Sequence, residues 1–497
     1  MASPTVAVVG AGPTGLATAC GLRLAGVSVR VLDKASGPAP TSRALGLQPR
    51  GAEVLDRLGA LGDLPEHSVR IGQVLTYVDG NPLARLRVGQ PTRLVTRPGL
   101  LMSQADVERR LRERLAALGV DVEWGSELLE TEQDDERVRL RLTAAEVHAD
   151  WLVGCDGAHS RVRKAARIDF PGVPVVERFF LADVTAKLPV GRDTVAVWLR
   201  GDRMLGAFPL PGHDLWRLMA PAPADAGDDP LPVLRALLAE EAGVPASGVD
   251  DVRWTSTFRI HRRLASTYRR GRILLAGDAA HIHSPFGGQG MNTGLGDAEN
   301  LAWKLALVAT GHAANSLLDT YEAERRPVAA EVLRSTSAMT GLLLGRTRPA
   351  RMLRDHAFVP LLDRPVVQRL LWEKSSQLNL TYRTGPLGGG VPYGGRPRPG
   401  DRIPDIACTR SDGAATRLYV ELPTRWGMLT TAGRATGEWE AITGRHLGAG
   451  SVAVLRAASV HGRGIWLVRP DGHLAWRGTS PAGLDTALTR ILSNGRQ

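Results

Sequence analysis

Apolar runs and a glycine-rich turn alternate at the start of the chain. Residues 6–9 are four consecutive apolar positions, as in a strand that is buried on both faces of a parallel sheet. From Leu16 onward the apolar positions recur at helical spacing, and a second strand is indicated at 27–32. This pattern predicts the first strand, helix and second strand of a βαβ unit.

The turn of this unit carries three glycines within six residues. Such a turn lets backbone N–H groups approach a pyrophosphate at the positive N-terminus of the helix. Asp33 follows the second strand, where a carboxylate can hold the ribose hydroxyls of a dinucleotide. We therefore predict a nucleotide site that contains Gly10, Gly12, Pro13, Thr14, Gly15, Asp33 and Lys34.

Two further motifs follow apolar runs later in the chain. At 154–163 an Asp-Gly pair, with Asp156 as its acid, precedes a serine and two arginines. At 273–278 an apolar run ends in Gly-Asp, and a glycine-rich loop then leads into a long predicted helix. The apolar face of that helix is formed by Leu295, Ala298, Leu301, Ala302, Leu305 and Val308.

The three motifs, in this order, resemble those of the FAD-dependent aromatic hydroxylases, the single-component flavoprotein monooxygenases. The stretch "YEAERRP" at 321–327 is similar to another feature of these enzymes. The stretches at 42–59 and 464–478 resemble the bacterial branch that tailors aromatic polyketides and carries an extra C-terminal domain with a thioredoxin-like fold. The resemblance covers most of the chain.

The resemblance implies that FAD is bound non-covalently and that NADPH or NADH is consumed together with O₂. Asp278 would contact the ribityl hydroxyls, and Met291 and Asn292 would contact the pyrimidine edge of the flavin. Asp156 would anchor a local network. The charge offered to the approaching NAD(P)H would come from Arg161 or Arg163. The other residues that resemble FAD contacts of the family are Arg43, Gln104, Pro285, Gly288 and Gly290.

The predicted fold class is α/β, with a Rossmann-like FAD-binding domain, an inserted antiparallel-sheet substrate domain and a C-terminal thioredoxin-like α/β domain. The stretch 417–422, "RLYVEL", is expected to be a strand of the last domain. The expected boundaries are 1–72, 97–172 and 268–384 for the FAD-binding domain, 73–96 and 173–267 for the substrate-binding sheet, 385–405 for a linker, and 406–497 for the C-terminal domain, which lacks a Cys-x-x-Cys motif.

The implied reaction is the hydroxylation of an aromatic, polycyclic polyketide through a flavin C4a-hydroperoxide, in the biosynthesis of antibiotics or other secondary metabolites. Baeyer–Villiger oxidation or epoxidation of a related polyketide is one alternative. Inactivation of an antibiotic and catabolism of a phenol are others. A flavoprotein that only sequesters a drug is the non-enzymatic alternative.

The substrate side of the site is the least defined. Aromatic residues of the predicted sheet are candidates for the pocket, and we single out Trp198, Phe208 and Trp216. A polycyclic phenol is itself electron-rich and needs little activation by the protein. The sequence therefore assigns no catalytic acid or base.

Composition narrows the choice of partners to small molecules. The formal charge is +11, but the arginines are scattered and mostly lie beside acidic residues, so we expect no nucleic acid. No apolar run is long enough for a bilayer and no signal peptide is recognised, so we expect a cytoplasmic monomer or homodimer without membrane contact. The three cysteines, and His281 with His283, lack the spacing of a metal site.

Overall fold

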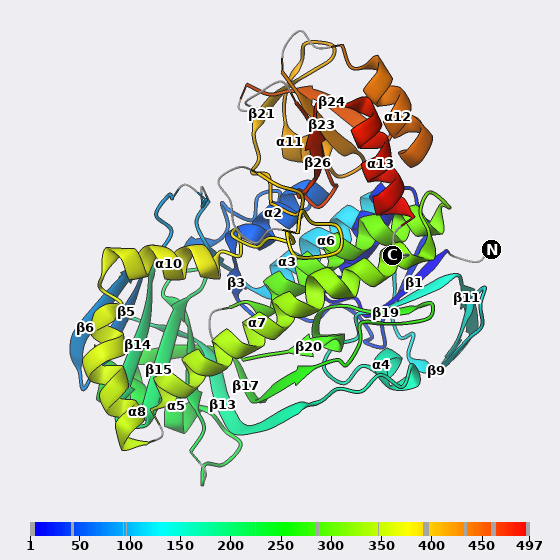
Figure 1. Cartoon of the computed structure of the whole chain (residues 1–497). Coiled ribbons are helices and arrows are strands. Elements are labelled where there is room, and N and C mark those ends of the chain that lie inside the picture. Colours follow the sequence, from blue (N-terminus) through cyan, green and yellow to red (C-terminus); the bar gives the residue numbers. More distant parts are fainter. Residues whose placement is uncertain are drawn as a thin grey trace.

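A computed structural model of the chain is shown in Figure 1. It describes residues 5–40, 44–92, 94–95, 97–223, 225–284, 288–345, 347–390, 397–431, 435–458 and 464–493, without the side chains of 173–177 and 260. Arg43 and Pro285, two of the predicted cofactor residues, lie outside the described residues.

The nucleotide-binding half of the molecule is built on a six-stranded sheet. All neighbouring strands from β19 to β8 in this sheet are parallel. Because parallel strands end at the same edge of a sheet, the motifs that follow β1, β12 and β19 are brought together there. The spatial order is β18 (Arg269–Arg270), β19 (Ile273–Leu275), β12 (Trp151–Gly154), β1 (Val6–Val9), β2 (Val29–Leu32) and β8 (Val122–Glu123).

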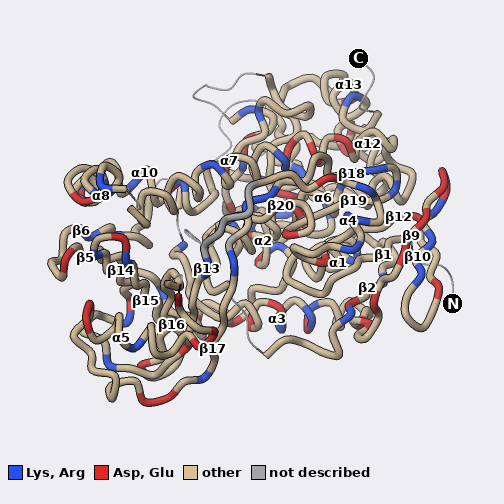
Figure 2. The backbone as a smooth tube through the Cα atoms, turned by 90° about the horizontal axis from the view of Figure 1, so that it is seen from below, with Lys and Arg blue, Asp and Glu red and all other residues tan. Residues whose placement is uncertain are grey.

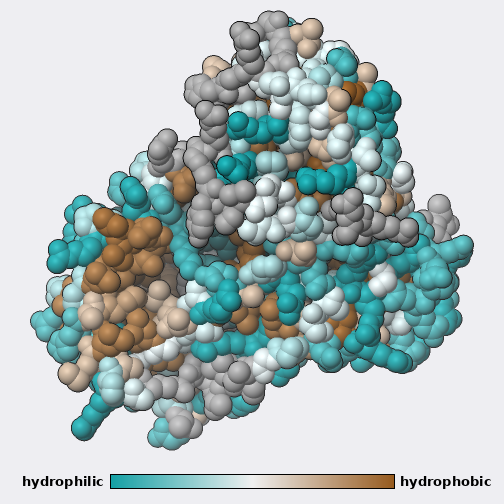
Figure 3. All heavy atoms as spheres, viewed as in Figure 1, coloured by the Kyte–Doolittle hydropathy of each residue, from teal (hydrophilic) through white to brown (hydrophobic). Residues whose placement is uncertain are grey.

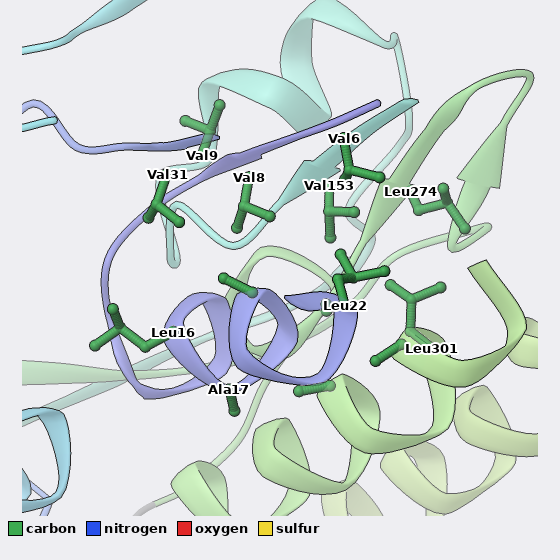
Figure 4. Packing of buried hydrophobic residues seen from close by; sticks show 14 of the residues in the cluster. Val6, Val8, Val9, Leu16, Ala17, Leu22, Val31, Val153, Leu274 and Leu301 are labelled. Carbon is green, nitrogen blue, oxygen red and sulfur yellow. The ribbon is translucent and has the colours of Figure 1, made fainter. Parts of the chain in front are cut away.

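Three helices pack against this sheet and bury its apolar core. They are α1 (Pro13–Leu24), α3 (Gln104–Ala117) and α6 (Gly290–Ala309), and α1 contacts both of the others. Figure 4 shows valines of the strands facing Leu22 of α1 and Leu301 of α6. The continuous apolar run predicted for β1 is therefore explained, since all four of its residues are buried.

Several short elements complete this half of the molecule. The three-stranded sheet that contains β9 lies beyond β8 in the chain, and α4 contacts β9. A second small sheet pairs β7 with β3 and β4. The bounds of these elements are β3 (Gly46–Leu47), α2 (Pro49–Leu58), β4 (Val69–Arg70), β7 (Leu100–Leu101), β9 (Leu128–Gln133), β10 (Val138–Leu142), β11 (Glu146–Ala149), α4 (Arg161–Ala165), η2 (Gly277–Ala279) and η3 (Asn315–Leu318).

The second large element is an eight-stranded sheet, called the substrate sheet below. Its neighbouring strands are antiparallel except for β14 and β5, which are parallel. The predicted inserted sheet is therefore present and mainly antiparallel, and the parallel pair of β14 and β5 joins its earlier segment to its later one. The spatial order is β20 (His281–Ile282), β17 (Val249–Leu264), β13 (Gly172–Ala186), β16 (Leu215–Pro221), β15 (Arg203–Pro209), β14 (Thr194–Arg200), β5 (Gln73–Val78) and β6 (Asn81–Arg87).

Helices cover both faces of the substrate sheet. Helix α5 (Leu231–Ala242), followed by η1 (Ala246–Gly248), packs on one face. The opposite face packs against the end of α7 (Asp319–Leu344) and the helices that follow it. In Figure 3 hydrophobic residues gather at the left, over the region of these later helices and the sheet beside them. The later helices are α8 (Arg348–Leu353), the π-helix η4 (Arg354–Phe358), α9 (Val359–Leu361) and α10 (Pro365–Ser375).

The C-terminal domain stands on top of the nucleotide-binding half in Figure 1. It contains a six-stranded sheet in which β23 and β24 are parallel, and helices α12 (Gly437–Leu447) and α13 (Pro481–Leu492) contact each other. The buried residues of α13 are all apolar and lie on one face of the helix: Leu484, Ala487, Leu488, Ile491 and Leu492. The sheet order is β22 (Ala415–Arg417), β21 (Ala407–Arg410), β24 (Val452–Arg456), β23 (Trp426–Thr430), β25 (Ile465–Val468) and β26 (Leu474–Gly478).

One predicted strand of this domain is wrong. Most of the stretch 417–422 forms the short helix α11 (Leu418–Glu421). Leu418, Tyr419 and Leu422 are all buried, and this spacing fits one side of a helical turn rather than the alternation of a strand. A short apolar run with a β-branched and an aromatic residue does not distinguish the two structures by sequence.

The charges of the molecule are distributed as the sequence indicates. Figure 2 shows lysine and arginine interspersed with acidic residues along the described chain, without a continuous basic stripe. No helix in the described ranges is both long and apolar enough to cross a membrane.

Candidate FAD site

In the glycine turn after β1, backbone atoms crowd Gly10 and Gly15 but leave space beside Gly12. Gly10 has φ +107°, and a Cβ atom there would lie 2.3 Å from the carbonyl oxygen of Cys155, just after β12. A Cβ atom at Gly15 would lie 1.9 Å from the carbonyl oxygen of Gly10. At Gly12, the residue before α1, a Cβ atom would meet no described atom within 4 Å. Gly10 and Gly15 are therefore required by packing, whereas Gly12 leaves backbone open for a phosphate.

Asp33 lies beside this turn at the end of β2. Its carboxylate accepts hydrogen bonds from the N–H groups of Ala11, at 2.7 Å, and Ala35, at 2.8 Å. Gln104 begins α3 and donates to Glu108 at 2.7 Å. Desolvation, helped by the nearby charge of Asp33, raises the pKa of Glu108. These polar groups lie together at one end of the site. If Asp33 holds the ribose hydroxyls as predicted, the sugar of the nucleotide lies at this end. The neighbouring Lys34 is exposed.

Asp156 organises the second motif by binding Ser160, the N-cap residue of α4, and the first N–H groups of that helix. It accepts hydrogen bonds from the hydroxyl of Ser160, at 2.6 Å, and from the backbone N–H groups of Arg161, at 2.6 Å, and Val162, at 3.1 Å. The local network predicted for Asp156 is therefore present, and it fixes the start of α4.

The Arg163 side chain is buried and connects two segments of backbone, so its charge is not free to meet a ligand. Its guanidinium donates to the carbonyl oxygens of Ala279, at 2.8 Å, and Ala158, at 2.9 Å, and it stacks on Phe170. Because Ala279 follows Asp278, this arginine ties the second motif to the third. Its contacts favour the bracing role over the predicted encounter with NAD(P)H. Arg161 is exposed, and for this residue the coenzyme role stays a prediction.

We expect Arg163→Ala to lower the free energy of unfolding by roughly 2–3 kcal/mol, because one buried and one partly buried carbonyl group lose their donor. Thermal unfolding of the variant measures this loss. The rate of flavin reduction by NADPH in anaerobic stopped flow should stay near that of the unmodified enzyme. Arg161→Ala is the matched control, with unchanged stability and slower reduction. A stable Arg163→Ala variant that is reduced slowly would reverse the two assignments.

Asp278 lies in the short helix η2 directly after β19. Thr14 of α1 packs there so closely that a Cβ atom at Gly277 would lie 2.5 Å from its hydroxyl oxygen. The Asp278 side chain is accessible to solvent. Desolvation nevertheless raises its pKa, and the carboxylate of Asp297 adds to the shift while His281 opposes it. A carboxylate that is both accessible and surrounded by protein lies in a recess, as an acceptor for ribityl hydroxyls would.

The first turn of α6 provides backbone donors that have no partner among the described residues. The first N–H groups of a helix have no partner within it, and no side chain caps this one. Asn292 is fully buried, and its amide donates to the carbonyl oxygens of Gly46, at 2.9 Å, and Gly288, at 2.8 Å, while it accepts from the N–H of Gln48 at 2.8 Å. Its side chain is therefore committed to fixing the loop. The contact with the pyrimidine edge of the flavin, predicted for Met291 and Asn292, can still be made by their backbone N–H groups, and this stays a prediction.

A buried network behind the third motif was not found by sequence reasoning. Asp297 accepts from the N–H of Gly277 at 3.1 Å and from the imidazole of His281 at 2.6 Å. Arg325 donates to Asp297 at 2.7 Å and to the hydroxyl of Tyr382 at 2.8 Å. Although burial alone would raise it, His281 and Arg325 hold the pKa of Asp297 below its usual range. The available signal was an acid at position 297, within the apolar stretch of the helix.

The predicted pocket aromatics fall on opposite faces of the substrate sheet. Trp198 and Trp216 belong to the cluster that α5 covers, and they are almost fully buried. Phe208 packs with Phe179 and Phe258 on the other face, against α7. The prediction is therefore corrected for the two tryptophans, because side chains alternate between the faces of a strand and sequence alone did not show which face meets the nucleotide-binding half. Phe208 remains a candidate.

The site fits FAD. It combines open backbone at Gly12, a carboxylate at the end of β2, an accessible carboxylate at Asp278 and the uncapped N-terminus of α6. Negative charge on a flavin ring is stabilised at such a helix end. No group of three or more metal-ligating side chains occurs among the described residues. Fold and site together define a flavoprotein of the dinucleotide-binding α/β class.

Comparison with known proteins identifies the family. A family model described as FAD binding domain matches residues 3–336, and one described as aromatic-ring hydroxylase, C-terminal, matches residues 396–495. The chain belongs to the FAD-dependent aromatic-ring hydroxylases and is an FAD-dependent monooxygenase. The family predicted from the three motifs is confirmed.

Individual relatives span the whole chain. The chain is 36% identical to a 6-methylpretetramide 4-monooxygenase of Streptomyces rimosus, over 98% of this chain and 93% of the relative. It is 35% identical to a rifampicin monooxygenase of Rhodococcus hoagii, over 97% of each. A solved anhydrotetracycline hydroxylase from Streptomyces rimosus superposes with a TM-score of 0.81 at 34% identity, covering 99% of this chain and 100% of that one.

Proposed function

We propose that this monooxygenase hydroxylates a polycyclic aromatic polyketide in antibiotic biosynthesis, using NADPH or NADH and O₂. The observation that carries the proposal is the full-length similarity to a 6-methylpretetramide monooxygenase and an anhydrotetracycline hydroxylase. The apolar face of the substrate sheet, with Phe179, Phe208 and Phe258, supports an aromatic substrate.

In this proposal one group of residues would bind the flavin and another would bind the substrate. When bound, FAD supplies the redox chemistry that accepts electrons from the coenzyme and activates oxygen. The N–H groups at the start of α6 would hold negative charge on the flavin, and Asp278 would hold the ribityl chain. The apolar face of the substrate sheet would orient the flat substrate and exclude water from the site.

Product analysis tests this function. The purified enzyme is incubated with NADPH, O₂ and a panel that includes anhydrotetracycline and other polycyclic phenols, and the products are examined by mass spectrometry. Gain of one oxygen with an intact carbon skeleton is expected, and reactions without NADPH are the control. Ring expansion or a lactone would instead indicate Baeyer–Villiger oxidation.

A second candidate function is inactivation of an antibiotic. The 35% identity to a rifampicin monooxygenase over nearly the full chain favours it specifically. Rifampicin therefore belongs in the same panel. Preferential oxygenation of rifampicin, together with loss of its antibacterial activity, would replace the biosynthetic assignment.

We expect the flavin to be held without a covalent bond. The imidazole of His281 is hydrogen-bonded to Asp297 through Nε2 at 2.6 Å, and burial raises the pKa of Cys155, so its thiol stays protonated and poorly nucleophilic. Acid precipitation of the holoenzyme should leave yellow flavin in the supernatant, where absorbance measures it. Flavin that remains in the washed protein pellet would contradict the expectation.

A further inference from the structure

The junction of β17 and β20 places two polar side chains on one face of the substrate sheet. The two strands are antiparallel, with Arg263 opposite Ile282 and Leu264 opposite His281. Extending this register by one residue sets Arg262 opposite His283. Residues directly opposite each other in antiparallel strands share a face. Figure 1 shows the two strands side by side below α7.

This face is turned toward the flavin site. Phe258 lies four residues before Arg262 on the same strand, hence on the same face, and packs in the cluster that includes the end of α7. His283 lies against the first turn of α6. A Cβ atom at Gly290 would be 3.5 Å from its Cε1 atom and 3.8 Å from its Nε2 atom. His283 therefore lies beside the start of α6, and the extended register puts Arg262 next to it on the same face of the sheet.

Both side chains carry a buried nitrogen without a hydrogen-bond partner. These atoms are Nε of Arg262 and Nε2 of His283. Within the described part of the chain, the Arg262 guanidinium makes no hydrogen bond or ion pair, so its charge is not neutralised by a carboxylate. Buried polar groups of native proteins are normally paired, and an orphaned pair beside a ligand site indicates that the ligand completes it.

The hydrogen bond of Nδ1, the other imidazole nitrogen, determines the tautomer of His283. Nδ1 lies 3.1 Å from the carbonyl oxygen of Ser284, which can only accept, so Nδ1 carries the proton. Desolvation, with a smaller contribution from His281, lowers the pKa of His283 to about 4. The ring is therefore neutral at neutral pH, and Nε2 presents a lone pair to the site.

A cationic donor beside a neutral acceptor matches the hydrogen bonding of a hydroxyl group. A carboxylate or phosphate would face the lone pair of Nε2 with another lone pair, and a carbonyl would leave Nε2 unpaired. A hydroxyl donates its proton to Nε2 and accepts from the guanidinium with its oxygen. We propose that Arg262 and His283 form the subsite for a phenolic hydroxyl of the aromatic substrate. This inference rests on the proposed function and specifies its substrate class.

The subsite would orient the ring and prepare it for attack. A phenol whose proton is drawn toward Nε2, while a positive charge lies beside its oxygen, is held in one direction on the sheet. Its ring carbons ortho and para to the oxygen gain electron density, and these are the carbons that an electrophilic oxygen donor attacks. Arg262 and His283 thus contribute to the choice of the carbon that is hydroxylated.

Binding of a matched pair of probes tests the subsite without turnover. Equilibrium dialysis of the oxidised, FAD-loaded enzyme without NADPH measures the affinities for 2-hydroxyanthraquinone and 2-methoxyanthraquinone. The unmodified enzyme should bind the phenol about tenfold or more tightly than the ether, as expected for charge-assisted hydrogen bonds. Arg262→Gln and His283→Phe should each abolish most of this preference. Arg262→Lys should retain part of it.

Arg259→Gln is the matched control, because Arg259 is an exposed arginine on the same strand. It should leave the preference unchanged, and FAD content with circular dichroism verifies the fold of each variant. Equal binding of the two probes, failure of the phenol to bind, or an unchanged preference in Arg262→Gln and His283→Phe would overturn the proposal. Loss of FAD with an unchanged phenol preference would assign the pair to the cofactor. Failure of the proposed function is distinguishable, because it shows as absent oxygenated product while binding persists.

Discussion

Asp278→Ala is expected to purify largely without flavin. The carboxylate is accessible in the recess after β19, and it makes no hydrogen bond or ion pair within the described part of the chain. A charge-assisted hydrogen bond to a ribityl hydroxyl contributes roughly 1.5–3 kcal/mol, which corresponds to about a tenfold to hundredfold weaker affinity per bond. The ratio of flavin to protein absorbance and titration of apoenzyme with FAD measure the effect.

Two comparisons separate a cofactor contact from general damage. Asp250→Ala, which removes an exposed carboxylate in β17, should retain full flavin content. The thermal midpoint of the Asp278→Ala apoenzyme should equal that of the unmodified apoenzyme, and variant saturated with FAD should keep most of its activity. Full occupancy in the purified Asp278→Ala protein would refute the ribityl assignment.

Asp471→Asn is expected to lower the free energy of unfolding by roughly 3–5 kcal/mol, because it leaves buried charges without their partner. Asp471 is in the C-terminal domain and is 1% exposed. It pairs with Arg469 and accepts hydrogen bonds from Trp303, at 3.2 Å, and Asn300, at 3.3 Å, both on α6. Although burial opposes it, Arg469 and His473 hold the pKa of Asp471 well below its usual range. Urea denaturation of the holoenzyme measures the loss.

Asp485→Asn is the control for this variant. Asp485 pairs with Arg445 and His446 in the same domain, but its side chain is 44% exposed, so solvent screens both pairs and the free energy of unfolding should hardly change. Because α6 also carries the flavin end of the site, FAD release from Asp471→Asn should occur at a lower urea concentration. Equal stability of the two variants would show that the buried cluster contributes little.

The parts of the fold that sequence predicts well are those where one residue type has one physical role. Gly10 and Gly15 are required by contacts shorter than any side chain allows, and the acids of the second and third motifs follow strands that end at one edge. Prediction failed where the sequence is compatible with two arrangements. Trp198 and Phe208 are both aromatic, and only the pairing of the strands decides which face each occupies.

Polar pairs between residues far apart in the chain also could not be predicted from the sequence. Arg325 lies in a stretch that resembles the family, but its contacts with Asp297 and Tyr382 depend on how α6, α7 and the following segment meet. Arg163 looked like a free charge because its acceptors are backbone carbonyl groups, which no residue type reveals. Orphaned nitrogens such as Nε2 of His283 likewise become visible only when every neighbour is placed.

The buried cluster under the C-terminal domain decides how chimeric enzymes of this kind can be made. Arg469 reaches Glu324 of α7 at 2.8 Å, and Arg402 pairs with Glu53 of α2. A graft that exchanges only the C-terminal domain and the segment around Arg402 would leave these acids facing a foreign surface in a buried interface. A workable exchange must carry the matching faces of α2, α6 and α7 with it, so the unit of recombination is this whole charged interface and not the segment of chain between two linkers.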